Sequence, residues 1–202
     1  MELRRVGRDA LLVEVPDALA ALALYDEARR RGVRASDIVP AARTVLLITD
    51  PARTSLSAVA DAVRRTTPRP DARTGGEVVE LPVHYDGADL EELAGLLDLT
   101  PEELVRRHTG GEWTVAFGGF APGFGYLTQS GGEWDVPRRS TPRTRVPPGS
   151  VALAGGFSGV YPRESPGGWQ LIGRTDVAVF ELLREPAALL RPGVRVRFVE
   201  VS

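Results

Sequence analysis

The stretch from Gly118 to Gly168 most constrains what this chain can fold into. It holds 12 of the chain's 22 glycines and seven of its 16 prolines. Its densest part, Gly118–Leu127, reads Gly-Gly-Phe-Ala-Pro-Gly-Phe-Gly-Tyr-Leu. Glycine and proline at this density interrupt helices and favour bends, so the stretch predicts short strands and turns with aromatic rings beside exposed backbone.

The composition is that of a globular protein. The 202 residues are 43% apolar and 26% charged, which is enough for one large domain or two small ones. No apolar run approaches the roughly 18 residues that a membrane-spanning helix needs, and the first five residues are not followed by the apolar part of a signal peptide. We therefore expect a cytoplasmic protein without a membrane partner.

The residue types that are missing exclude several chemistries. There is no cysteine and there are only two histidines, which argues against disulfides, thiol nucleophiles and a metal site. All 25 basic residues are arginine, so the chain has no lysine for a phosphate-binding loop or a Schiff base. A net charge of -2 without a basic stripe predicts no nucleic-acid binding.

The first half of the chain predicts an α/β sandwich. Apolar residues alternate in the expected strands and recur at helical spacing in the expected helices, and a polar, turn-rich stretch over 67–76 comes before the last strand. The predicted order is βαββαβ, in a first domain over residues 1–84 with a packing or interaction role. The expected elements are strands 10–15, 36–41, 44–49 and 77–83 and helices 17–32 and 56–66.

The second half changes character. Thr100 to Glu103 form a capping box with proline at the first helical position, and leucine spacing predicts a short helix before it. Beyond Gly110 short apolar stretches alternate with turns, which is typical of a β-barrel over residues 85–202. The fold class is therefore α+β. The expected elements are helices 90–97, 101–108 and 186–190 and strands 113–117, 151–154, 170–172, 177–182 and 194–201.

Two kinds of segment could carry chemistry, and each has a plain structural alternative. Four arginines within residues 138–145 suit carboxylate or phosphate oxygens, or they pair with surface acids. The glycine-rich segments 155–162 and 165–175 offer backbone amides to an oxyanion, or they are simply barrel turns. His84 and His108 are interpreted as structural, with His108 at the barrel mouth as an acid or base the alternative.

Three separated motifs resemble one known family. The segments Gly119–Leu127, Thr141–Val151 and Ser165–Thr175 are similar to the signatures of the B subunit of 5-oxoprolinase, also called allophanate hydrolase subunit 1, a family that includes the kinase inhibitor KipI. The likeness extends in order from about Leu81 to Val199. It implies a ferredoxin-like first domain and a cyclophilin-like barrel.

The resemblance also implies a function that depends on partners. In this family three proteins, the A, B and C subunits, together open 5-oxoproline to glutamate at the expense of ATP. The chain is therefore expected to join a hetero-oligomer with a C-subunit homologue and an A-subunit homologue, and to be inactive alone. The nucleotide site is expected elsewhere in the complex. Two alternatives are a KipI-like inhibitor of a sensor histidine kinase and a component of a urea- or allophanate-type amide-processing complex.

The motif match places a set of residues at a substrate pocket without assigning a catalyst. We expect Tyr126 and Arg143 to lie at one pocket mouth, where the arginine would bind an anionic group. The chain departs from the family at Phe157-Ser158, where relatives commonly have an amide and a hydroxyl side chain, so the ring changes the polar contacts available. The expected pocket residues are Phe120, Pro122, Gly123, Phe124, Tyr126, Arg143, Pro147, Gly149, Ser150, Tyr161, Pro162, Ser165, Pro166, Trp169 and Thr175.

Overall fold

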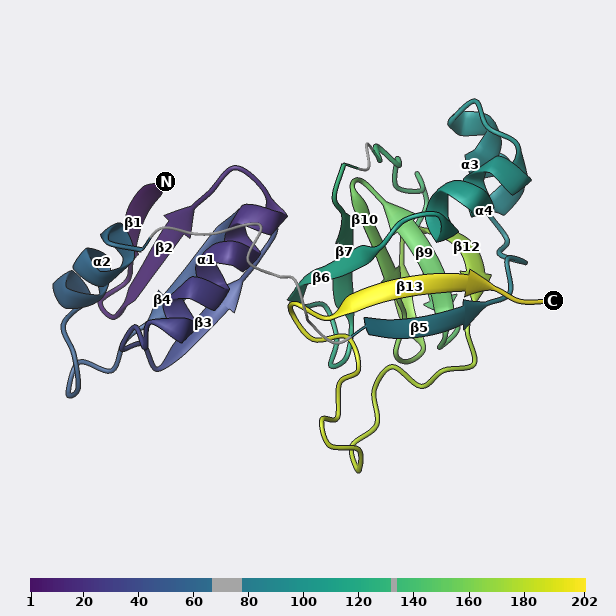
Figure 1. The fold of residues 1–202 in the computed structure, drawn as a ribbon. Coiled ribbons are helices and arrows are strands. Elements are labelled where there is room, and N and C mark those ends of the chain that lie inside the picture. Colours follow the sequence, from purple (N-terminus) through teal and green to yellow (C-terminus); the bar gives the residue numbers. More distant parts are fainter. Residues whose placement is uncertain (67–77, 132–133) are drawn as a thin grey trace. The chain divides into compact units, whose positions relative to one another are not determined.

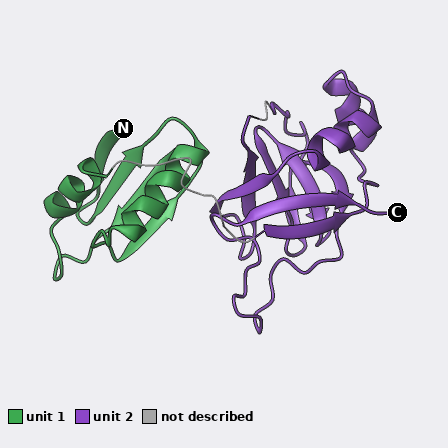
Figure 2. Ribbon diagram, viewed as in Figure 1, with its two compact units in different colours: residues 1–75 green, residues 76–202 purple. Residues whose placement is uncertain are grey.

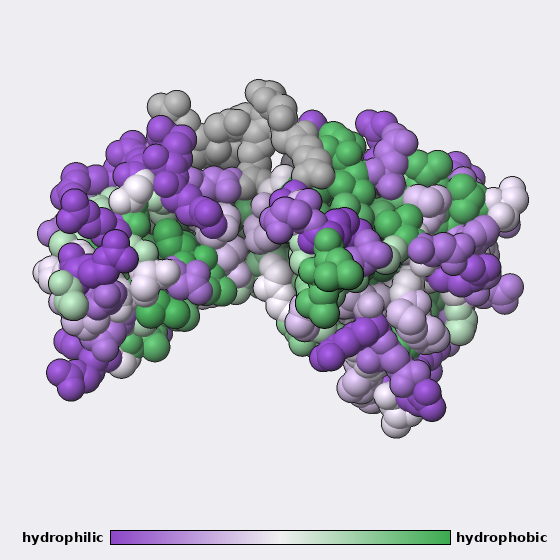
Figure 3. All heavy atoms as spheres, turned by 90° about the horizontal axis from the view of Figure 1, so that it is seen from below, coloured by the Kyte–Doolittle hydropathy of each residue, from purple (hydrophilic) through white to green (hydrophobic). Residues whose placement is uncertain are grey.

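The computed structural model describes residues 1–66, 78–131 and 134–202 and has two compact units, Met1–Gly75 and Gly76–Ser202 (Figure 2). The turn-rich stretch expected over 67–76 lies outside the described residues. In the space-filling view, hydrophilic side chains cover much of each unit, with apolar side chains between them (Figure 3). No helix in the described part of the chain is long and apolar enough to cross a membrane.

The first unit is a four-stranded antiparallel sheet with two helices packed on one face. Asp17 begins α1 by accepting a hydrogen bond from Ala20 N at 2.8 Å, and Ser55 begins α2 by accepting one from Ala58 N at 3.2 Å. The buried sheet face packs against both helices in one apolar core. The elements are β1 (Glu2–Val6), β2 (Ala10–Glu14), α1 (Ala18–Arg30), β3 (Asp37–Pro40), β4 (Thr44–Ile48) and α2 (Leu56–Arg64).

The strand order of this unit corrects one prediction. The order is β1-β2-β4-β3, and β1, which the sequence did not indicate, forms a hairpin with β2. Strand β5 (Val78–Val83) exists where a strand was expected, but it pairs in parallel with β13 (Arg195–Glu200) in the other unit, so its assignment to the first domain is wrong. The reason is burial, because Leu81 and Val83 are fully enclosed in the second core. The expected limit at residue 84 therefore falls after a strand of the second unit.

The second unit is a barrel-like sheet that nearly closes on itself (Figure 1). Its seven strands follow the order β12-β9-β10-β7-β6-β13-β5. The two outer strands meet where His84, just after β5, exchanges backbone hydrogen bonds of 2.9 Å with Arg174 at the end of β12. The remaining strands are β6 (Trp113–Gly118), β7 (Gly125–Gln129), β9 (Ser150–Ala154), β10 (Phe157–Val160) and β12 (Gln170–Arg174), with a separate pair β8 (Arg143–Val146) and β11 (Ser165–Gly167).

Two helices stand beside this sheet as predicted. They are α3 (Leu90–Leu96) and α4 (Pro101–Thr109), and the Thr100–Glu103 capping box is formed in both directions. Leu93 and Leu104 point from them into the core that fills the barrel. Sequence periodicity was reliable here because the cap residues and the apolar stripe indicate the same start.

The segment between β12 and β13 differs from the prediction. Neither the strand expected over 177–182 nor the helix expected over 186–190 forms, and the segment doubles back through a single bridge between Phe180 and Ala188. Two backbone hydrogen bonds join its arms, from Glu181 N to Ala187 O at 3.0 Å and from Leu189 N to Val179 O at 2.9 Å. The Arg184 guanidinium adds to them by donating to Ala178 O at 2.8 Å and to Ala187 O at 3.1 Å.

Candidate functional site

Seven aromatic side chains in or beside the glycine-rich motifs form one connected group, here called the aromatic cluster. The Phe117 and Tyr126 rings stack with centroids 4.4 Å apart, and the Phe124 and Trp169 rings meet edge to face at 5.5 Å. Such offset and edge contacts are those that aromatic rings prefer. Three glycine-rich segments that are separate in the sequence thus meet in space. The cluster consists of Phe117, Phe120, Phe124, Tyr126, Phe157, Tyr161 and Trp169.

Phe120 is where the cluster reaches solvent. Its side chain is 57% exposed, yet its ring lies 5.3 Å from that of Phe124 and 6.0 Å from that of Tyr161. Its backbone has φ of 63°, a left-handed conformation that costs a bulky residue on the order of 1 kcal/mol or more. The strained backbone beneath an exposed ring at the edge of a buried cluster makes Phe120 a candidate for ligand contact.

Two glycines are required because rings lie directly against the backbone. A Cβ at Gly159 would lie 2.8 Å from Phe124 Cζ, and a Cβ at Gly167 would lie 2.3 Å from the Tyr161 hydroxyl oxygen. Both distances are below what real side chains tolerate. The glycines of the β10 and β11 motifs therefore serve close ring packing.

The expected residues Pro147, Gly149, Ser150, Tyr161 and Thr175 meet at one turn beside the cluster. Gly149 N donates to Tyr161 O at 2.8 Å, and Thr175 N donates to Gly149 O at 2.9 Å. Gly149 has φ of 79°, and a Cβ there would lie 2.3 Å from Thr175 O. These positions build the turn through their backbone, with Ser150 and Thr175 buried.

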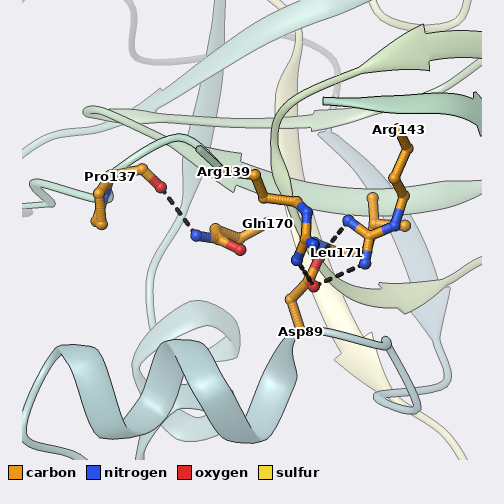
Figure 4. Close-up of polar contacts among 6 residues, drawn as sticks. All are labelled: Asp89, Pro137, Arg139, Arg143, Gln170 and Leu171. Carbon is orange, nitrogen blue, oxygen red and sulfur yellow. Dashed lines mark hydrogen bonds and ion pairs between the residues drawn. The ribbon is translucent and has the colours of Figure 1, made fainter. Parts of the chain in front are cut away.

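Next to this turn, a buried carboxylate binds two of the four clustered arginines. Asp89 is 1% exposed, and both outer nitrogens of Arg143 donate to it, at 2.8 and 2.7 Å (Figure 4). Arg139 donates to the same carboxylate, and Leu171 N donates to it at 2.7 Å. The sequence does not indicate this role for Asp89, because an aspartate before a helix is ordinarily a cap, whereas this side chain makes no cap hydrogen bond.

The charge of Asp89 is maintained by its donors. Burial alone would raise the pKa of this carboxyl, but the hydrogen bonds from Arg143 and Leu171 outweigh burial and keep the pKa below its ordinary value. The same pairing raises the pKa of Arg143. The Arg143 guanidinium, which was expected to bind an anionic ligand, thus already binds the Asp89 carboxylate. A contact of Arg143 with a ligand stays a prediction.

His108 lies in the barrel core and is fully buried. Its Nδ1 lies 2.7 Å from the Tyr85 hydroxyl and its Nε2 lies 2.9 Å from the Ser158 hydroxyl. Burial lowers the pKa of His108 to about 3, so the ring is neutral, with one nitrogen donating and the other accepting. The structural interpretation is therefore confirmed, and a role at the barrel mouth is wrong because no part of the ring meets solvent.

Phe157 and Ser158, where the chain departs from the family pattern, lie on opposite faces of β10. The Phe157 ring faces outward and contacts Phe117 and Tyr126, at 5.6 and 5.8 Å between centroids. Ser158 faces inward to His108. Neighbouring residues of a strand point to opposite faces, so the ring belongs to the aromatic cluster and the retained hydroxyl to the core.

The other expected residues lie around the cluster without ring contacts. Pro122 and Pro166 are exposed and Pro162 is half-buried. Gly123 has φ of 84°, and a Cβ there would lie 2.4 Å from Phe180 Cβ, so the loop that carries Phe120 requires glycine at this position. Ser165 is buried and its hydroxyl donates to Arg163 O at 3.1 Å.

Comparisons with known proteins agree with these motifs. Residues 1–190 match the family described as carboxyltransferase domain, subdomain C and D. The chain is 47% identical over 135 residues to the 5-oxoprolinase B subunit of Bacillus subtilis (strain 168), an alignment that covers 65% of this chain and 56% of the relative. The chain thus spans little more than half the length of that curated relative.

Solved structures show the same fold. The crystal structure of TTHA0988 superposes with a TM-score of 0.80 at 37% identity, over 96% of this chain and 40% of that one. The K. lactis urea amidolyase superposes with a TM-score of 0.74 over 99% of this chain and 15% of that one, and its 17% identity supports likeness of fold alone. Because the family match spans nearly the whole sequence, this chain belongs to the carboxyltransferase domain family, subdomain C and D.

Proposed function

We propose that the chain acts as the B component of an ATP-dependent 5-oxoprolinase, which converts 5-oxoproline, ATP and water to glutamate, ADP and phosphate. The observation that carries this proposal is the 47% identity to a protein named as the B subunit of 5-oxoprolinase, together with the convergence of separate glycine-rich motifs on one aromatic cluster. The barrel-like unit would be of the cyclophilin-like type and the first unit a variant of the ferredoxin-like sandwich.

In this proposal the aromatic cluster provides one wall of the 5-oxoproline site. The exposed Phe120 ring would cover an apolar face of the lactam, and the half-buried Tyr126 would offer its hydroxyl to the amide. The Tyr161 pKa is raised, mainly by burial, so this phenol stays protonated near neutral pH. Ring stacking and hydroxyl donors hold and orient a small cyclic amide, and they do not supply the energy for opening it.

The missing energy source implies partners. The sequence has no lysine and therefore no phosphate-binding loop of the usual kind, so ATP would be bound by another protein of the complex. We propose a hetero-oligomer with homologues of the A and C subunits, in which this chain contributes substrate-contacting surface. Its cytoplasmic location stays a prediction.

Reconstitution tests the proposal. The chain is purified with the A and C subunits of the same complex, and glutamate release from 5-oxoproline is measured with and without ATP. We expect release only when all three proteins and ATP are present. Release by this chain alone would contradict partner dependence, and a complete complex that acts on urea-derived amides but not on 5-oxoproline would replace the proposed substrate.

A further inference from the structure

The first unit contains an open surface hollow that none of the motifs predicted. It has a volume of about 370 Å³ and lies between the end of α1 and the helix α2. The exposed side chains of Arg31, Arg34 and Arg65 line it, together with the smaller apolar side chains of Val33, Ala58 and Ala62. We call this hollow the arginine pocket.

The arginines of this pocket are incompletely neutralised. Arg31 donates to Glu27 at 2.6 Å, whereas within the part of the chain that the structure describes Arg34 and Arg65 have no side-chain hydrogen bond or ion pair. The neighbouring Arg64, by contrast, binds Asp61 at 2.9 Å. No aspartate or glutamate lines the pocket among the described residues.

Positive charge continues on one side of the arginine pocket. An adjoining hollow of about 270 Å³ shares Arg34 and Thr54 with it and adds Arg53. Asp50 also lines this second hollow and accepts a hydrogen bond from Ala52 N at 3.0 Å. A single carboxylate thus faces several guanidinium groups, which leaves an excess of positive charge around the concave surface.

We propose that the arginine pocket binds a phosphate-bearing small molecule. Guanidinium forks match the oxygens of phosphate, and a group with two negative charges suits two arginines that lack an internal partner. Val33, Ala58 and Ala62 provide a small apolar surface for the remainder of the ligand, and the volume falls within the range of about 300 to 1,000 Å³ typical of small-molecule sites. A hollow of this size in a chain of net charge -2 fits a small molecule better than nucleic acid.

This site is separate from the proposed oxoprolinase function. It lies wholly within the first unit, and none of its residues belongs to the motifs around the aromatic cluster. Failure of glutamate release in the reconstituted complex would leave the pocket proposal intact, and absence of phosphate binding would leave the 5-oxoprolinase proposal intact.

Titration calorimetry of the full chain tests the proposal with inorganic pyrophosphate, phenyl phosphate and succinate as three separate probes, none of which takes part in the proposed 5-oxoprolinase reaction. We expect saturable binding of at least one phosphate probe, with one ligand per chain, and weaker or no binding of succinate. Arg34→Gln and Arg65→Gln should each raise the Kd of the phosphate probe by about tenfold or more, since each removes a charged hydrogen bond.

Arg43→Gln is the matched control, because Arg43 is an exposed arginine of the same unit outside the pocket. It removes the same charge and should change affinity by less than about twofold, because charges at a distance are screened by salt. If Arg43→Gln lowered the affinity for the phosphate probe as much as the pocket variants do, the loss would reflect the overall charge of the chain and the proposal would be overturned. The absence of saturable phosphate binding at about 10 mM probe, or tighter binding of succinate than of either phosphate probe, would overturn it as well.

Discussion

Arg143 and Asp89 form a two-pronged ion pair between β8 and the start of α3, with N–O distances of 2.7 and 2.8 Å. The carboxylate is buried, and the arginine side chain is 24% exposed. Because Asp89 also accepts a hydrogen bond from Leu171 N in β12, one side chain ties together three segments that are distant in sequence. The pair therefore holds β8 and β12 together, the two strands that precede the turn of Gly149 and Thr175.

The first prediction concerns this carboxylate. Asp89→Asn keeps the shape but removes the charge that neutralises Arg139 and Arg143, so unfolding free energy should fall by about 2 kcal/mol, a value discounted because both arginines partly meet solvent. Urea unfolding measures the change. Asp86→Asn is the control, because its pair with Arg174 is about half exposed on both sides and should contribute less than about 1 kcal/mol. Equal losses of unfolding free energy in the two variants would contradict the structural role of the buried Asp89 carboxylate.

The second prediction separates binding from packing in the aromatic cluster. Phe120→Ala should leave unfolding free energy within about 1 kcal/mol of the wild type, because the ring is largely exposed and alanine keeps the Cβ and therefore the same backbone strain. In the reconstituted complex kcat/KM for 5-oxoproline should fall by about tenfold or more. Phe124→Ala, at a ring that is 3% exposed, should instead cost about 3 to 5 kcal/mol of stability. Unchanged kcat/KM in Phe120→Ala would remove this ring from the site.

The third prediction is a pH dependence of stability that arises from His108. Its folded pKa is about 3, so below the ordinary value of 6.5 the unfolded chain binds a proton that the folded chain does not. Stability is therefore complete above pH 6.5 and declines as the pH falls toward 3, by at most about 1.4 kcal/mol per pH unit from this residue. Urea unfolding at several pH values between about 7 and 4 measures the slope.

The control for the His108 prediction is His108→Gln, which keeps a hydrogen-bonding side chain without a titrating ring. Carboxylates such as Asp89, whose pKa is lowered, add a slope of the same sign in both proteins. The difference between the two slopes therefore belongs to His108. Identical slopes would mean that the buried imidazole is not neutral.

The fourth prediction uses two glycines of opposite surroundings. Gly159→Ala would bring a Cβ within 2.8 Å of Phe124 and should destabilise the protein by about 1 to 3 kcal/mol. Gly95, inside α3, has no atom within 4 Å of an added Cβ, so Gly95→Ala should stabilise by about 0.5 to 1 kcal/mol through helix propensity. Thermal unfolding of both variants checks the signs, and a tolerated alanine at 159 would show that the rings are not held against this strand.

The fifth prediction concerns the two units. Their apolar cores share no residue, since one consists of residues from 11 to 63 and the other begins at Leu81. A fragment over residues 76–202 should therefore fold alone, with the near-ultraviolet circular dichroism of packed aromatics. Loss of that signal in the fragment would show that the barrel-like unit needs the first unit.

The sequence predicted those parts of the fold that rest on local signals. Thr100-Pro101 and the leucine stripe located α4 because capping and periodicity depend on neighbouring residues. Strand β1, Glu-Leu-Arg-Arg-Val, has no clean alternation and forms because its hairpin with β2 offers a ladder. The parallel pairing of β5 with β13 joins segments more than a hundred residues apart, which no local pattern encodes.

The candidate site shows the same division. Family motifs indicated the rings of Phe120, Phe124, Tyr126, Tyr161 and Trp169, and these meet in space. The motifs did not indicate Asp89, because a carboxylate that neutralises two arginines is recognised only when distant segments are placed side by side. The same holds for the arginine pocket, whose residues come from the segment after α1 and from α2 and its flanks.

The back-to-back placement of Phe157 and Ser158 has a consequence for substitutions at residue 157. Substitutions at 157 alter the surroundings of Tyr126 on one side of β10, while the hydroxyl that holds His108 stays on the other side. The strand thus separates the ring contacts of the cluster from the polar contacts of the barrel core. A change of side chain at 157 would therefore reshape the wall beside Tyr126 and leave the hydrogen bond between Ser158 and His108 in place.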